Sequence, residues 1–170
     1  MKKTSPKTKK IIKIIIGSIV FAFLFLFILF IIPYSLLEDK VISSLGEYKK
    51  HEYFTSGGFQ DYTDYAKYYY TTVNITENIY FEKIQEDDFE TINIHLDDFE
   101  MWIEAHKESD PSKEVVVNYD FNREIIDTND YIYIDSEEHT WNDGHTSLVN
   151  YNIYFFDTET SILYYFHNNI

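Results

Sequence analysis

Residues 86–107, with the sequence EDDFETINIHLDDFEMWIEAHK, decide how the folded part of this chain is built. Apolar side chains recur along this segment at intervals of three and four residues, which is the repeat of one face of an α-helix. This stripe consists of Phe89, Ile92, Leu96, Phe99, Ile103 and the partly apolar His106. Acidic residues crowd its start and Lys107 lies at its end, as the helix dipole favours. The pattern predicts one long amphipathic helix that ends before Pro111.

A second interpretation of the same segment is open. Ile92, Ile94 and Leu96 also alternate with polar residues, as they would in a strand. A shorter helix would then begin near Asp97, whose side chain can cap its own helix. We favour the single long helix because the apolar stripe continues on both sides of the doubtful stretch.

Downstream of this helix the sequence has the features of an antiparallel β-meander. Short runs of β-branched and aromatic residues predict strands at 131–134, 151–156 and 162–166. A polar connection over 135–147, with a turn at Asn142-Asp143-Gly144, separates the first two strands, and residues 157–160 form the second turn. A long helix before such a meander, without β-α-β alternation, predicts an α+β fold with an antiparallel sheet.

Upstream of the helix, residues 61–75 are dense in tyrosine. Alternation over this segment predicts a strand, because tyrosine favours half-buried pleated surfaces. The same side chains are a candidate binding site, since a row of tyrosines can stack on a glycan or a peptide. The candidates are Tyr65, Tyr68, Tyr69 and Tyr70. Residues 49–60, which contain Ser56-Gly57-Gly58, are predicted to form a loop.

The amino-terminal part of the chain has a different character. Nineteen consecutive residues, Ile14 to Ile32, are strongly apolar except at Gly17 and Ser18. A helix of this length spans roughly the 30 Å hydrocarbon core of a bilayer. No polar face is present, as a soluble amphipathic helix would require. We therefore predict a transmembrane helix over residues 11–33.

A cleaved signal peptide is the main alternative to this anchor, because lysines precede the apolar run. The run is longer than the roughly 7–15 apolar residues of such peptides, and no A-x-A-like cleavage site follows it. The lysines also set the orientation, since positive residues flank the cytoplasmic side of a membrane helix. The expected organisation is a cytoplasmic tail (1–10), the anchor (11–33), a juxtamembrane neck (34–50) and an acidic extracytoplasmic domain (51–170).

Charge excludes one class of partner. Residues 34–170 hold all 29 acidic side chains and 8 basic ones, which leaves a formal charge of −21 outside the membrane. Such a surface repels nucleic-acid phosphates, so no nucleic acid is expected to bind this domain. The chain has no cysteine, which excludes disulfides and a thiol nucleophile. Few alanines and one arginine, beside many lysines, asparagines and isoleucines, suggest an AT-rich bacterial source.

Motifs for chemistry are sparse. His139, Asp143 and His145 place two imidazoles and a carboxylate within seven residues, which makes them a candidate site for a divalent cation. Their spacing matches no zinc motif, and no cofactor is otherwise expected. Acidic residues are so numerous that no pair of them indicates acid–base catalysis.

The sequence therefore predicts a single-pass membrane protein at the cell surface whose outer domain is an interaction module. Its expected partner is a protein or an envelope component, in addition to the bilayer that holds residues 11–33. A second copy is a further candidate, because Ser18 and Ala22 form a small-xxx-small pair in the anchor. The alternatives are a tethered surface hydrolase that uses carboxylates and a module that depends on a divalent cation.

Overall fold

The computed structural model describes residues 18, 39–57, 62–140 and 146–169. The chain forms two compact units, Met1–Ser43 and Ser44–Ile170, and the second holds the sheet. The predicted tail and anchor lie outside the described residues, except for Ser18, which is helical. No helix in the described part of the chain is long and apolar enough to cross a bilayer.

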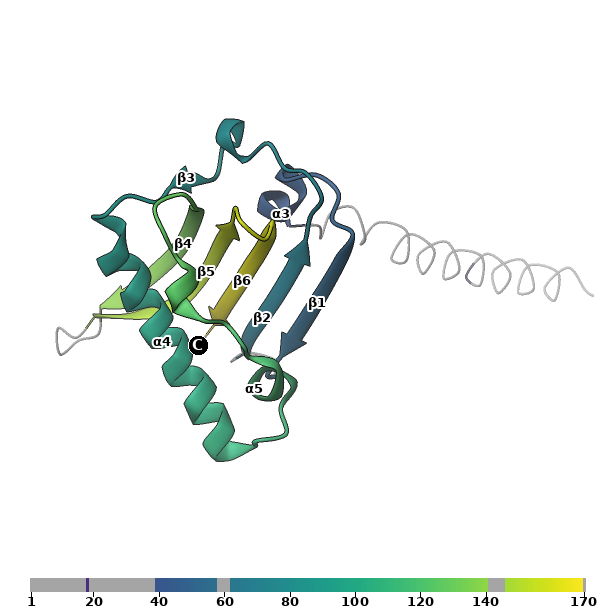
Figure 1. Cartoon of the computed structure of the whole chain (residues 1–170). Coiled ribbons are helices and arrows are strands. Elements are labelled where there is room, and N and C mark those ends of the chain that lie inside the picture. Colours follow the sequence, from purple (N-terminus) through teal and green to yellow (C-terminus); the bar gives the residue numbers. More distant parts are fainter. Residues whose placement is uncertain (1–17, 19–38, 58–61, 141–145, 170) are drawn as a thin grey trace, which may run out of the picture. The chain divides into compact units, whose positions relative to one another are not determined.

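The second unit has an α+β fold, as the sequence predicts, with a six-stranded antiparallel sheet (Figure 1). The strand order is β1-β2-β6-β5-β4-β3. The strands are β1 (Lys50–Thr55), β2 (Tyr62–Tyr69), β3 (Glu82–Lys83), β4 (Tyr131–Thr140), β5 (Thr146–Asp157) and β6 (Ile162–Asn169). The helices of this unit are α4 (Asp88–Ser109) and α5 (Glu114–Asn118), with 3-10 turns η1 (Ile75–Glu77) and η2 (Arg123–Ile125). The short helix α3 (Lys40–Ser44) lies at the boundary of the two units.

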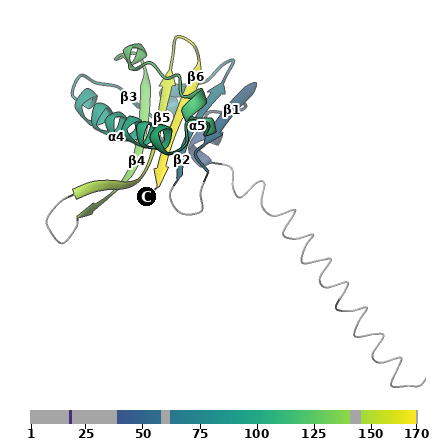
Figure 2. The ribbon, with the colours of Figure 1, turned by 90° about the horizontal axis from the view of Figure 1, so that it is seen from below.

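α4 is one uninterrupted helix of 22 residues, so the alternative start near Asp97 is wrong. The predicted stripe forms its inner face, where Ile92, Leu96, Phe99 and Ile103 are buried. The helix ends where Asp110 takes an extended conformation before Pro111. Seen along the sheet, α4 and α5 lie on the same face (Figure 2), which we call the helix face.

The main core lies between α4 and the sheet. Ring contacts hold the two layers together: Phe99 of α4 meets Phe166 of β6 edge to face, with centroids 5.3 Å apart. Tyr65, Tyr151 and Phe166 present their rings to this layer and have almost no exposed surface. Aromatic pairs of this kind add about 0.5–1.5 kcal/mol beyond the burial of their area.

Two stretches that the sequence predicts as irregular are strands. The predicted loop over 49–60 is wrong for Lys50–Thr55, which form β1 and pair with β2. β1 is an edge strand with mixed burial, so it lacks the clear alternation of a half-buried strand. The predicted connection over 135–147 is also mostly strand, since β4 continues to Thr140 and β5 resumes at Thr146. The turn predicted at residues 142–144 lies outside the described residues.

A buried carboxylate ties the two connections at one end of the sheet together. Asp130 accepts hydrogen bonds from the backbone amides of Asp127 and Thr158, at 3.1 and 2.9 Å. The predicted turn after β5 is stabilised in the same way, because Asp157 Oδ1 accepts from the backbone amide of Glu159 at 2.9 Å. These contacts set where β4 begins, and β4 carries the candidate site.

Candidate functional site

The tyrosines that the sequence offers as a stacking row lie on both faces of β2. Tyr65 and Tyr69 point to the helix face and Tyr68 points to the opposite face. Tyr70, directly after β2, shares the side of Tyr68, because both rings contact Tyr48. Three of them are buried, and only Tyr69 keeps an intermediate exposure. The Tyr65 hydroxyl donates to Asp120 Oδ1 at 2.9 Å, and burial raises the pKa of Tyr65. The structure therefore buries Tyr65, Tyr68 and Tyr70 and divides the four rings between two faces, so they form no single surface for stacking.

The Tyr69 hydroxyl belongs to a small network of charges beside β1. It donates to Glu52 Oε2 at 2.7 Å, while Lys50 Nζ lies 2.6 Å from Glu52 Oε1. The hydrogen bond from Lys50, helped by that from Tyr69, lowers the pKa of Glu52 to about 2. Lys67 bridges this network to Asp120, with Nζ 2.8 Å from Oδ2. The network fastens β1 and β2 to the segment after α5, and its role is structural.

The candidate cation site is only partly described. His139 is exposed on β4, whereas Asp143 and His145 lie outside the described residues. Within the described residues, no group of three or more histidine, aspartate or glutamate side chains is arranged to hold a metal ion.

Several carboxylates that could serve in catalysis are paired with cations. Arg123 Nη1 lies 2.6 Å from Asp97 Oδ1, and its Nη2 lies 2.8 Å from Glu100 Oε2. Both carboxylates belong to α4, so the arginine fastens η2 to this helix. Asp98 accepts from the buried Tyr151, and burial raises the pKa of Asp98. These acids hold secondary-structure elements together, so a structural role explains their positions without a role in catalysis.

A chain of polar side chains connects the end of α4 to the sheet. Lys113 Nζ lies 3.0 Å from His106 Nδ1, and His106 Nε2 lies 3.0 Å from Thr63 Oγ1. An ammonium group only donates, so Nδ1 accepts and the neutral imidazole carries its proton on Nε2. Burial, and secondarily the charge of Lys113, lowers the pKa of His106. Thr63 in turn donates to Asn168 Oδ1 at 2.8 Å, which anchors the end of β6.

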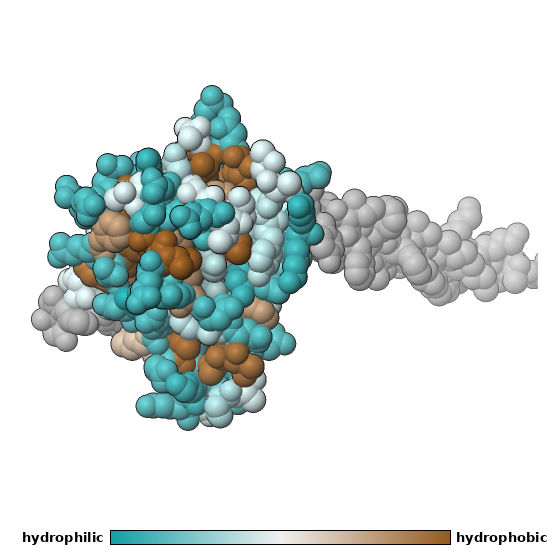
Figure 3. Space-filling view, viewed as in Figure 1, coloured by the Kyte–Doolittle hydropathy of each residue, from teal (hydrophilic) through white to brown (hydrophobic). Residues whose placement is uncertain are grey.

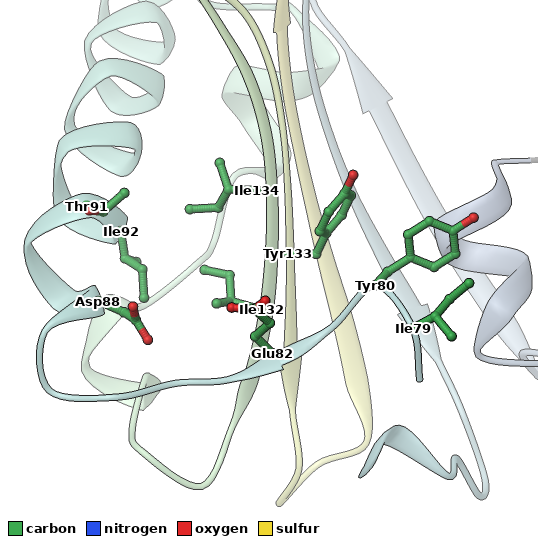
Figure 4. A pocket seen from close by; sticks show the side chains of 9 residues that line it. All are labelled: Ile79, Tyr80, Glu82, Asp88, Thr91, Ile92, Ile132, Tyr133 and Ile134. Carbon is green, nitrogen blue, oxygen red and sulfur yellow. The ribbon is translucent and has the colours of Figure 1, made fainter. Parts of the chain in front are cut away.

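A hollow of about 400 Å³ lies between the start of α4 and β4. Figure 4 shows Ile92 of α4 and Ile132 and Ile134 of β4 on one side of the strand. Tyr80 and Tyr133 lie on its other side, with ring centroids 5.6 Å apart. The remaining lining residues are Ile79, Glu82, Asp88 and Thr91. The hollow is thus apolar toward the sheet and the helix, with carboxylates at its rim.

The outer edge of β4 is open next to this hollow. β3 pairs only with Tyr131 and Ile132, and Ile84 donates its amide to the Asp130 carbonyl at 3.0 Å. In an antiparallel ladder, both backbone polar groups of every second residue point to the same neighbouring strand. Ile134 and Ser136 therefore direct their amide and carbonyl groups outward. No described residue pairs with these four groups.

Charge marks this edge as well. Asp135, Glu137 and Glu138 are exposed along β4, and Glu82 is exposed on β3. Asp135 and Glu137 lie on the face opposite α4, whereas Ile134 and Ser136 lie on the helix face. Figure 3 shows a mostly hydrophilic surface over the side that carries α4, with separate apolar patches. The open edge thus combines unpaired backbone groups, an apolar hollow and negative charge.

The sequence does not reveal this edge. Residues 135–140 are polar and have no strand signal of their own, so their pairing with β5 is visible only in the structure. One feature of the sequence could have indicated that the strands are longer. The connection between the predicted strands at 131–134 and 151–156 has more residues than a hairpin loop usually has.

The chain matches no protein-family model, no curated protein and no solved structure.

Proposed function

We propose that this protein is a membrane-anchored, non-catalytic binding module that captures an extended segment of a partner protein as an added strand along β4. The observation that carries the proposal is the open edge at Ile134 and Ser136. An extended chain placed there forms main-chain hydrogen bonds to the sheet, which is a general mode of peptide recognition.

The hollow beside the edge supports this function. Side chains of an added strand alternate between the two faces of the sheet. Those on the helix face would enter the space lined by Ile92, Ile132 and Ile134. Backbone pairing then supplies binding that is independent of sequence, and the hollow supplies selectivity.

The predicted anchor fits the same role. A helix over residues 11–33 would hold the domain at the outer surface of the membrane, where a captured partner stays close to the bilayer. The described acidic residues that have ion-pair or hydrogen-bond partners stabilise the fold. The open edge of β4 has no such structural role, so we explain it by binding.

The test uses Ser136, because its amide points away from β5. Proline at this position removes that donor and leaves the β4–β5 ladder complete, as proline on an open strand edge does. Ser136→Thr, which keeps the amide, is the matched control. A library of displayed random peptides is selected on the full-length protein in detergent, and the enriched peptides are then measured on the variants.

We expect enriched peptides to bind wild type and Ser136→Thr alike, and to bind Ser136→Pro at least about tenfold more weakly, which is roughly 1.4 kcal/mol. Bound peptide should also slow hydrogen exchange at the amides of Ile134 and Ser136. Circular dichroism verifies that Ser136→Pro keeps its sheet. Peptides that bind Ser136→Pro as tightly as wild type, or a library without enrichment, would overturn the proposed function.

A further inference from the structure

We infer that the segment captured at β4 alternates aliphatic and basic residues, with the aliphatic side chains toward α4 and the basic ones toward the opposite face. This inference rests on the proposed function and names the chemistry of the partner. The two sides of the β4 edge differ in character, and an added strand has to match both of them.

The helix face of the edge requires aliphatic side chains. Ile132 and Ile134 point to this side of β4, and Ile92 of α4 faces them across the hollow (Figure 4). Part of the hollow of about 400 Å³ lies on this side, beside Ile92, Ile132 and Ile134, and can receive a branched aliphatic group from the added strand. Burying such a side chain removes apolar surface from water, and this gain favours binding against the cost of ordering the segment.

The opposite face of the edge requires positive charge. Asp135 and Glu137 both point there, at neighbouring positions of one strand face, and both are exposed. An added strand places its own Cβ atoms about 5 Å from the Cβ atoms of these two residues. Opposite charges at cross-strand positions stabilise pairing, and like charges at these positions weaken it.

The same carboxylates argue against a second copy as the occupant. Antiparallel pairing of two β4 edges would bring Asp135, Glu137 and Glu138 of both copies together. Charged side chains on an edge strand are a common means of preventing such sheet-to-sheet association. A basic segment avoids this repulsion and is attracted by the carboxylates, so the edge favours a basic segment over a second copy of the chain.

Four synthetic peptides of about eight residues, with blocked ends, test the inference. Three alternate isoleucine with lysine, glutamate or threonine, and the fourth has the composition of the lysine peptide with its lysines and isoleucines in two blocks. Each is titrated against the full-length protein in detergent by fluorescence anisotropy. The proteins are wild type, Ser136→Pro, a double variant with Asp135→Asn and Glu137→Gln, and Thr91→Phe, which fills the hollow.

We expect the alternating lysine peptide to bind at least about tenfold more tightly than the other three. The double variant should bind this peptide about tenfold more weakly, and its affinity should depend less on salt between about 50 and 200 mM. Thr91→Phe should weaken binding by a similar factor, whereas Asn93→Phe, an exposed position on the same helix, should not.

The outcomes separate the inference from the proposed function. If the glutamate or threonine peptide binds as tightly as the lysine peptide, and Ser136→Pro still weakens binding at least about tenfold, the partner chemistry is wrong and strand addition stands. Equal binding of the alternating and block peptides also refutes the inference. If Ser136→Pro binds every peptide as wild type does, strand addition itself is refuted.

Discussion

The Tyr151 hydroxyl on β5 donates a 2.9 Å hydrogen bond to Asp98 Oδ2 on α4, and this contact joins the helix to the middle of the sheet. Tyr151 has no exposed surface, whereas Asp98 is half-buried. Burial raises the pKa of Asp98, and the bond from Tyr151 opposes that rise. The pair shows how this acidic domain accommodates a carboxylate near its core.

Removing the hydroxyl with Tyr151→Phe should lower the free energy of unfolding by about 1.5–3 kcal/mol, since a partly buried carboxylate loses its donor. Urea unfolding of the full-length protein in detergent, followed by circular dichroism, measures the change. Tyr131→Phe is the control, because no hydrogen bond of its hydroxyl occurs within the described residues. A loss at Tyr151 no greater than that at Tyr131 would show that the bond contributes nothing.

Phe99 should be the position on α4 most sensitive to truncation. Its ring is fully buried and meets Phe166 of β6 and Tyr119 after α5. Phe99→Ala is expected to cost about 3–5 kcal/mol through lost burial and the cavity left behind. Met101→Ala, on the exposed side of the same helix, should change stability by less than about 0.5 kcal/mol. Similar losses at the two positions would contradict the packing described here.

The charge network beside β1 predicts a loss of stability in acid. The pKa of Glu52 is lowered to about 2, so its contribution is complete above its ordinary value of 4.5 and is lost as pH falls through 2. The pair is near the surface, which limits the contribution to about 0.5–1 kcal/mol. Thermal unfolding between pH 5 and 2 should show a steeper decline for wild type than for Glu52→Gln. Parallel curves for the two proteins would rule out this contribution.

His106 predicts a second pH dependence in a higher range. Its pKa is lowered below 6.5, because burial and Lys113 disfavour the imidazolium. The folded state therefore excludes a proton that the unfolded chain binds, and stability present above pH 6.5 is lost as pH falls through the lowered value. His106→Gln can keep both hydrogen bonds without titrating. Its free energy of unfolding should fall less between pH 7 and 5 than that of wild type, and an equal fall would refute the role assigned to His106.

Periodicity predicted the parts of the fold that bury one face against another layer. The stripe from Phe89 to Ile103 specified α4, because a helix on a sheet must hide one continuous face. The strands β5 and β6 were predicted near their centres for the same reason, since residues such as Ile153 and Phe166 are buried. The sheet edges were not predicted, because β1 and the outer half of β4 have polar or mixed faces and depend on their neighbours for structure.

The candidate site could not be derived from composition. The density of tyrosines pointed to β2 as a binding surface. The rings of Tyr65 and Tyr68 are buried, however, on opposite faces of that strand. Whether a backbone amide is paired depends on strand order and register, which are long-range properties. The open groups of Ile134 and Ser136 are visible only once β3 is seen to end its pairing at Ile132.

The position of β6 between β2 and β5 has a consequence for how the domain is made. Ladders β1–β2 and β3–β4–β5 share no strand, and β6 is the element that joins them. A ribosome must therefore release residues 162–169 before the two halves can combine, and the nascent chain holds unsatisfied strand edges until then. Contacts of such long sequence separation slow folding. Completion of the sheet this late would suit the export that the proposed membrane anchor requires, because a membrane channel passes only unfolded chain.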